Sequence, residues 1–331
     1  LENIKMKKMK LLLGVAAAVF MLAAPASAKA VEVPAVSSYS GETVSAQAVK
    51  HGLIIKGNKI TYWYKGRQAK NCWKKWEGNR YYFNQNGNAV RGGVRIKTGN
   101  TYVTYVLDEN GRQITDKTNR MVTVNGNLYY ITSKYGRAAT GYFIYKNNLY
   151  YADPKGRCYK NRSRENGQLQ FGSNGKAKRN YDALLKMRVM TIVSRITNSN
   201  MTKSEKLGAC WNYVVSNFYY GGPDPNLNST GWARSEALRM LSSGYGNCYG
   251  FSCTFAALAR EVGYSPYMMC GRVPGSRDGA ADGYTRHCWV RINGLYYDPE
   301  AQYAGWMRGV YGYSYYPISH QVQKVVSFNN H

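Results

Sequence analysis

The chain has 331 residues, with 45 lysines and arginines against 18 aspartates and glutamates, and therefore a net charge of +27. This length allows about two domains. The charge favours anionic partners through long-range attraction, and because no signature of a nucleic-acid-binding module accompanies it, we expect partners other than nucleic acid.

The first 28 residues have the pattern of a secretory signal peptide. Lys7, Lys8 and Lys10 precede an apolar stretch from Leu11 to Ala24, and the small residues Ala26-Ser27-Ala28 follow it. We expect cleavage after Ala28, a linker over residues 29–50 and a secreted protein. No second apolar stretch follows, so we predict no membrane association after cleavage.

Residues 51–180 are repetitive and rich in tyrosine, glycine and asparagine. An aromatic pair followed by a turn glycine recurs in "GNRYYFNQNGNAVRGG" from Gly78, "GNLYYITSKYGRAATGY" from Gly126 and "NNLYYADPKGRC" from Asn147. Such self-similarity at a fixed period is typical of repeat arrays. Each copy is predicted to form strand, polar turn and strand, and the copies must stack because one hairpin buries too little surface alone.

The order of aromatic residues and glycines resembles the cell-wall-binding repeats of Gram-positive surface proteins, which include choline-binding and glucan-binding modules. The resemblance implies attachment to an anionic wall polymer or a glycan. One departure concerns the glycine and tryptophan that usually follow the turn, since this chain has Gly92-Gly93 and Gly141-Tyr142 there. Tryptophan is the best wall for a quaternary ammonium group. An alternative is that the tyrosines only pack one repeat against the next.

Helical patterns begin after residue 180. Tyr181 to Thr197 has apolar residues at the spacing of one helix face, and Thr202 with Glu205 forms a capping box that opens a second helix. Residues 234–241 are predicted to form a short helix. A loop rich in glycine, proline and asparagine over residues 221–231 precedes it.

Cys248 lies at the start of a further predicted helix, in "GYGNCYGFSC". Phe251, Phe255 and Leu258 share one face of this helix, and Cys248 lies at the edge of that face. At a helix start the sulfur meets unpaired N–H groups and the positive end of the helix dipole, and both favour the reactive thiolate. The backbone N–H of Cys248 is also a predicted oxyanion donor.

A histidine and an aspartate are predicted to meet in the segment "RHCWVRINGLYYDPE". Asn293-Gly294 is a strong signal for a two-residue hairpin turn, so Ile292 should face Leu295 and His287 should lie opposite Glu300. Side chains alternate along a strand, which places His287 diagonally next to Asp298, within reach of a hydrogen bond. The turn alone therefore predicts a base with a group that orients it.

The order of these features from Tyr181 to Tyr303 resembles the core of the transglutaminase-like family. The resemblance implies a papain-like α+β fold over residues 181–331, with Cys248 as nucleophile, His287 as base and acid, and Asp298 holding the imidazole. It implies attack on an amide of a peptide, a protein or a peptidoglycan stem peptide, with transfer of the acyl group to water or an amine. Trp289, Tyr249 and Trp232 are expected to line the cleft, and residues 274–286 to form a rim.

Two other interpretations stay open at this point. "NCYGF" superficially resembles the nucleophile motif of the NlpC/P60 wall hydrolases, and an enzyme-like domain can lose activity and serve in a surface-binding protein.

Seven cysteines cannot all pair, which leaves at least one free thiol. Cys72 with Cys158, and pairs among Cys210, Cys253, Cys270 and Cys288, are candidate disulfides whose connectivity the spacing does not fix. No C-x-x-C pair, histidine cluster or EF-hand loop is present. We therefore predict neither a metal site nor a cofactor.

Overall fold

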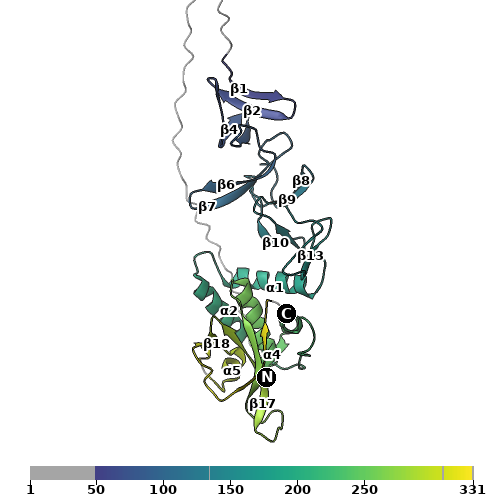
Figure 1. Cartoon of the computed structure of the whole chain (residues 1–331), viewed down its shortest axis with the longest axis vertical. Helices are drawn as coiled ribbons and strands as arrows, with labels where there is room; N and C mark the ends of the chain where they lie inside the picture. The colour runs from purple at the N-terminus through teal and green to yellow at the C-terminus, as the bar shows by residue number, and fades with distance from the viewer. Residues whose placement is uncertain (1–48, 134, 308, 330–331) are drawn as a thin grey trace, which may run out of the picture. The chain divides into compact units, whose positions relative to one another are not determined.

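The computed structural model describes residues 49–329 except residues 134 and 308. The described residues belong to one compact unit, in which small hairpins come first and helices with a larger sheet follow (Figure 1). The predicted signal peptide and the predicted linker up to residue 48 lie outside the described residues. No helix in the described part of the chain is long and apolar enough to cross a membrane.

Residues 52–171 form a series of antiparallel hairpins. A representative turn joins β8 to β9, where Val124 pairs with Asn127 and the two turn residues are Asn125 and Gly126. Both turn residues have positive φ, 47° and 73°, as a type I′ turn requires. The strands are β1 (Gly52–Lys56), β2 (Lys59–Tyr64), β3 (Arg67–Gln68), β4 (Cys72–Trp76), β5 (Asn79–Phe83), β6 (Gly92–Thr98), β7 (Thr101–Leu107), β8 (Arg120–Val124), β9 (Asn127–Ile131), β10 (Gly141–Tyr145), β11 (Asn148–Ala152), β12 (Arg162–Arg164) and β13 (Leu169–Phe171).

Each hairpin is joined to the preceding one by a backbone hydrogen bond from the segment that follows its second strand. The bonds run from the N–H of Ala89 to Ile60 O, Gln113 to Arg80 O, Ala138 to Thr104 O, Cys158 to Leu128 O and Ala177 to Leu149 O, at 2.8–2.9 Å. Apolar side chains such as those of Val122, Tyr129 and Ile131 fill the space between hairpins. The predicted hairpin-repeat module is thus confirmed.

Four helices of at least twelve residues follow within the described chain. They are α1 (Tyr181–Ile196), α2 (Lys203–Asn217), α3 (Trp232–Ser243) and α4 (Cys248–Glu261). The predicted capping box is present, because Thr202 Oγ1 accepts from Glu205 N and Glu205 Oε2 accepts from Thr202 N. Helix α3 extends two residues beyond its predicted range at each end.

A five-stranded antiparallel sheet, in the order β19-β18-β17-β16-β20, completes the fold. Its strands are β16 (Tyr267–Pro274), β17 (Tyr284–Ile292), β18 (Leu295–Tyr297), β19 (Tyr311–Tyr313) and β20 (Gln321–Ser327). The short helix α5 (Pro299–Ala304) follows β18, and β14 (Tyr219–Tyr220) pairs in parallel with β15 (Tyr245–Gly246).

Helix α4 runs through the main core. Twelve of its fourteen residues are buried, so it is enclosed on all sides instead of burying only the predicted face. Ser252 Oγ donates to the carbonyl of Cys288 on β17 at 2.7 Å and thereby joins the helix to the sheet. The predicted α+β class is confirmed, and this junction fixes the start of α4 near the middle of β17.

Candidate functional site

The start of α4 holds Cys248 as the first helical residue. The side chain of Asn247 caps the helix by accepting from the N–H groups of Tyr249 at 3.1 Å and Gly250 at 3.4 Å. Among the described residues no group accepts from the N–H of Cys248. Cys248 is 0% exposed. A buried sulfur therefore lies beside a free N–H at the positive end of a helix dipole.

His287 lies on β17 opposite Gly271 of β16. A Cβ at Gly271 would stand 2.0 Å from the carbonyl oxygen of Gln321 on β20, so only glycine allows the three strands to approach here. On the other side of β17 the pairing of Ile292 with Leu295 is the predicted one.

The hairpin of β17 and β18 is shorter than predicted. Strand β18 stops at Tyr297, and the chain turns into α5 at Pro299. The expectation that His287 lies opposite Glu300 in a continued strand is therefore wrong. The N–H of Asp298 bonds instead to Val310 O at 2.9 Å, and proline at the next position has no N–H for a ladder.

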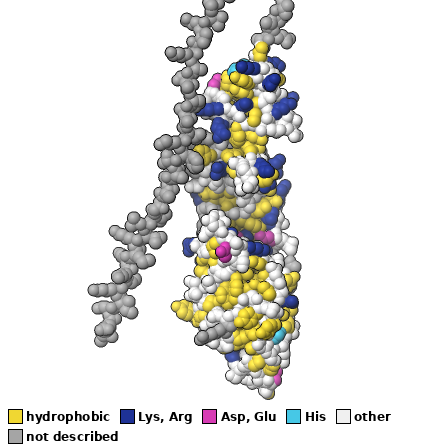
Figure 2. Space-filling model, turned by 90° about the vertical axis from the view of Figure 1, so that its left-hand side faces the viewer, with side chains coloured by type: hydrophobic (Ala, Val, Ile, Leu, Met, Phe, Trp, Pro, Cys, Tyr) yellow, Lys and Arg dark blue, Asp and Glu magenta, His cyan; other side chains and the backbone are white. Residues whose placement is uncertain are grey.

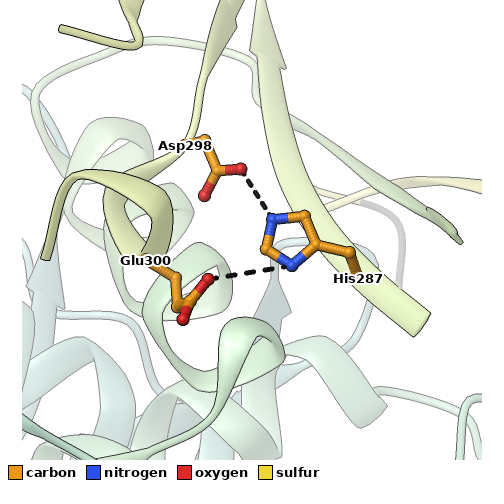
Figure 3. A group of neighbouring side chains, drawn as sticks. All are labelled: His287, Asp298 and Glu300. Atoms are coloured by element: carbon orange, nitrogen blue, oxygen red, sulfur yellow. Dashed lines mark hydrogen bonds and ion pairs between the residues drawn. The ribbon is translucent and has the colours of Figure 1, made fainter. Parts of the chain in front are cut away.

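Asp298 nevertheless meets His287. His287 Nε2 lies 2.6 Å from Asp298 Oδ2 (Figure 3). The same oxygen accepts from the hydroxyl of Tyr316 at 2.6 Å, while Oδ1 accepts from Ala301 N at 3.0 Å as the N-cap of α5. Asp298 is 0% exposed. Both of its oxygens are thus held by donors, which fixes the carboxylate against the ring.

Burial lowers the pKa of His287, but the charge and hydrogen bond of Asp298, followed by the hydrogen bond and charge of Cys248, raise that pKa well above its usual value. Since Asp298 takes Nε2, the ring nitrogen left to face Cys248 is Nδ1. The surroundings favour an imidazolium next to the sulfur, which is the arrangement that activates a thiol.

Glu300, on the first turn of α5, lies on the Nδ1 side of the ring. Its Oε2 stands 3.8 Å from His287 Nδ1 (Figure 3) and accepts from Trp306 Nε1 at 3.2 Å. Burial raises the pKa of Glu300, and Asp298 adds to the rise while His287 opposes it.

His287, Asp298 and Glu300 offer ligand atoms within 4.8 Å of one another, a spacing that could hold a metal ion. Both Asp298 oxygens already accept hydrogen bonds. We therefore interpret the group as a hydrogen-bond network.

Arg277 also acts on the sulfur. It lies within the predicted rim and donates to the hydroxyl of Tyr220 and to the carbonyl of Arg286. Burial lowers the pKa of Arg277, but the charge and hydrogen bonding of Cys248, together with Tyr220 and Asp278, raise that pKa overall. The guanidinium therefore lies near enough to the sulfur of Cys248 to interact with it electrostatically. The rim is further held by an ion pair of 2.6 Å between Arg286 and Asp224.

Residues 190–309 match the family model described as the transglutaminase-like superfamily. The chain contains a transglutaminase-like domain. This match favours the predicted transglutaminase-like family over the NlpC/P60 alternative.

No protein with a curated function matches the chain. Among solved structures, it is similar to choline binding protein F from Streptococcus pneumoniae, with 23% identity, a TM-score of 0.25, and coverage of 39% of this chain and 41% of that one. It is also similar to a truncated alternansucrase from Leuconostoc mesenteroides, with 25% identity, a TM-score of 0.28, and coverage of 43% and 12%. The chain thus spans less than half the length of either protein.

The three aromatic residues expected to line the cleft of the transglutaminase-like domain are enclosed. Trp289, Tyr249 and Trp232 are 0%, 4% and 1% exposed. Trp289 stacks against His287, with 6.0 Å between ring centroids. The more exposed aromatic residues at the site are Trp306, at 42%, and Tyr220, at 40%, and periodicity gives no signal for either of them.

The cysteines form no disulfide: all seven are free, and all seven lie in the described part of the chain. In the transglutaminase-like domain Cys270 pairs with Cys288 across β16 and β17, with 3.8 Å between the sulfurs. Burial raises the pKa of Cys288 and of Cys253 well above the usual value. These buried thiols are therefore less reactive than a thiol beside an imidazolium.

Proposed function

We propose that the chain is a cysteine-dependent acyl-transfer enzyme acting on amide bonds, with Cys248 as nucleophile, His287 as base and acid, and Asp298 as the group that orients the ring. The observation that carries the proposal is the placement of His287. Its Nε2 is hydrogen-bonded to a fully buried aspartate. A hydrogen bond with Cys248 and the charge of that sulfur contribute to the raised pKa of the ring. These are the partners that a nucleophilic cysteine needs.

In the proposed reaction the Cys248 thiolate attacks the amide carbonyl, and the free N–H of Cys248 stabilises the oxyanion. The imidazolium of His287 then gives its proton to the departing nitrogen, so that the C–N bond breaks and a thioester forms. In the second half, water or an amine gives a proton to His287 and attacks the thioester. The C–S bond breaks and the sulfur is released for another cycle.

The transglutaminase-like domain is proposed to act outside the cell, on peptides, proteins or peptidoglycan stem peptides. The predicted signal peptide of residues 1–28 supports secretion. The aromatic hairpin repeats and the net charge of +27 support attachment to an anionic wall polymer or a glycan.

The proposal predicts that iodoacetamide at neutral pH alkylates Cys248 before the other cysteines, because only this sulfur is paired with an imidazolium. His287→Ala should slow alkylation of Cys248 by at least about tenfold, since it removes the group that maintains the thiolate. Peptide mass spectrometry over a time course measures both.

Cys72 is the matched control, because it is only half-buried and lies in the repeats. Its labelling should not change in His287→Ala. If all seven cysteines react at similar rates, or if His287→Ala leaves Cys248 equally reactive, Cys248 is not an activated nucleophile. The alternative of a non-catalytic wall-binding or glycan-binding surface protein would then be favoured.

A further inference from the structure

Arg277 connects the two sides of the proposed active site. Its Nη2 donates to the carbonyl of Arg286, the residue before His287 on β17, and its Nη1 donates to the hydroxyl of Tyr220. Tyr220 belongs to β14, which pairs with β15, and β15 ends just before Cys248. A guanidinium is thus placed between the segment that carries the proposed nucleophile and the strand that carries the proposed base.

The charge of Arg277 has no close carboxylate partner within the described chain. Its ion pair with Asp278 joins Nε to Oδ1 at 3.4 Å. Asp278 is held by Arg286 instead, whose N–H donates to Oδ2 at 2.7 Å and whose guanidinium donates to Oδ1. By contrast, Arg234 and Arg260 contact their carboxylates at 2.5 and 2.6 Å. Since the planar guanidinium matches the two oxygens of a carboxylate, Arg277 is suited to a carboxylate that the substrate supplies.

The guanidinium is also accessible to a substrate. The side chain of Arg277 is 35% exposed, whereas Cys248 and His287 are 0% and 2% exposed. Three of its five N–H groups are used by the hydrogen bonds described above. A substrate carbonyl that reaches the sulfur therefore lies beside this cation, because Arg277 also interacts with Cys248 through charge and hydrogen bonding.

The position of Glu300 shows on which side of the scissile bond Arg277 lies. In the proposed reaction the departing nitrogen takes its proton from His287 Nδ1. Glu300 lies on that side of the ring, with Oε2 3.8 Å from Nδ1 (Figure 3). The charge of Arg277 acts on Glu300. Arg277 is therefore on the side of the departing amine.

We infer that Arg277 binds a free carboxylate on the departing amine, so that the enzyme removes the C-terminal residue of a peptide. The carboxylate of a C-terminal residue is two covalent bonds from the nitrogen of the last peptide bond, within reach of a guanidinium beside that nitrogen. An internal residue offers a neutral carbonyl there, and hydrogen bonds to a carboxylate are roughly twice as strong as those between neutral groups. The inference rests on the proposed acyl-transfer function and names its substrate class.

Each cycle would consume one water and release one amino acid. The thiolate of Cys248 attacks the carbonyl carbon of the last peptide bond, the C–N bond breaks, and the nitrogen takes the proton of His287. The amino acid leaves with its carboxylate. Water then gives a proton to His287 and attacks the thioester, and the C–S bond breaks to release the shortened peptide.

The test uses the full chain and matched peptides. A panel of N-acetylated tetrapeptides and a peptidoglycan stem pentapeptide are each made with a free C-terminal carboxylate and as the C-terminal carboxamide. Mass spectrometry of the shortened peptide gives kcat/KM for each form. The wild type should prefer the free acids by at least about tenfold. Arg277→Gln should bring the ratio of free acid to carboxamide to about one, and Arg277→Lys should restore part of the preference.

The ratio separates recognition of the carboxylate from other roles of Arg277. If the guanidinium only supported the sulfur or the loop between β16 and β17, Arg277→Gln would slow both forms equally and leave the ratio unchanged. Arg272→Gln is the matched control, because Arg272 lies on β16 just before the same loop but is paired with Asp282, with 2.6 Å from Nη2 to Oδ1. Its ratio should equal that of the wild type.

The inference can fail separately from the proposed function. Equal rates for the two forms in the wild type, or a preference that survives Arg277→Gln, overturn the role of Arg277 while cleavage still shows an active enzyme. A wild type that p-nitrophenyl acetate acetylates on Cys248, but that cleaves neither form of any peptide, overturns the inference alone. If neither cleavage nor acetylated Cys248 is found, the proposed function is overturned, and the inference with it.

Discussion

Tyr316 holds the carboxylate that orients His287. Its hydroxyl donates to Asp298 Oδ2 at 2.6 Å, the same oxygen that His287 Nε2 contacts. A donor to this oxygen withdraws negative charge from it, so the carboxylate attracts the imidazolium less than it would alone. Tyr316 is 5% exposed and stacks against Trp289, so phenylalanine should fit its position.

We predict that Tyr316→Phe raises the pKa of His287 by about one unit, since hydrogen bonds to charged groups contribute on the order of 1.5–3 kcal/mol. The thiolate–imidazolium pair should then persist to higher pH. In the pH profile for alkylation of Cys248, the alkaline limb marks the pH at which the imidazolium loses its proton. This limb should move to higher pH by the same amount.

The control for Tyr316→Phe is Tyr296→Phe. Tyr296 is a ring neighbour of Tyr316, and its hydroxyl makes no hydrogen bond to the site within the described chain. Its profile should match the wild type. If the alkaline limb moves to lower pH in Tyr316→Phe, the hydroxyl does not lower the pKa of His287, and the prediction is wrong.

At the scale of an element, α2 begins with a capping box that positions its buried face. Leu207, Cys210 and Trp211 on this helix pack in the main core with α4. We predict that Thr202→Ala lowers the free energy of unfolding by about 1 kcal/mol, because it leaves the N–H of Glu205 without its acceptor. Thermal unfolding followed by circular dichroism measures the change.

Ser204→Ala is the control for this substitution, because Ser204 is exposed in the first turn and its side chain makes no hydrogen bond in the described structure. It should not destabilise the chain. Hydrogen bonds from the backbone N–H and from the side chain of Thr202 lower the pKa of Glu205, and Thr202→Ala removes the second of them. Their contribution is therefore present above the usual pKa of glutamate and is lost as the pH falls through the lowered value. The effect of Thr202→Ala should shrink in acid, and an effect that grows there would contradict the assignment.

Sequence motifs that span only a few residues predicted the boundaries of elements correctly. Thr202 with Glu205 located the start of α2, and Asn293-Gly294 gave the correct pairing of Ile292 with Leu295. The prediction that the second strand continues past Tyr297 was wrong. The alternation of apolar and polar residues does not predict that the strand ends there, with Asp298 as the N-cap of a helix.

The rest of the site could not be predicted because its residues come from separate segments without periodicity. Tyr316 lies in an irregular segment before β20, and Arg277 lies in the loop between β16 and β17. The strand register predicted Glu300 only as the residue opposite His287. In the structure Glu300 lies on the first turn of α5, with Oε2 3.8 Å from His287 Nδ1. Three-dimensional packing alone reveals these partners.

At the scale of the whole molecule, the chain has far more basic than acidic side chains. Figure 2 shows lysine and arginine side chains spread over the hairpin repeats on the face in view. Several cations of the repeats cover aromatic rings. Arg80 lies 4.7 Å from the centroid of Trp73, and Arg164 lies 3.8 Å from that of Tyr151. Rings already faced by guanidinium groups are poor sites for a quaternary ammonium ligand.

We therefore predict that the full chain sediments with purified Gram-positive cell walls at low ionic strength and is released by salt, but not by free choline. Attraction between exposed charges is screened over about 10 Å at 0.1 M salt, so binding dominated by charge should weaken steeply as salt is added. Walls stripped of their anionic polymers are the control and should retain little protein. Release by choline at constant ionic strength would contradict the argument, since it would require an open aromatic site. Binding that survives high salt on stripped walls would indicate that a neutral glycan, held by the tyrosines, is the ligand of the repeats.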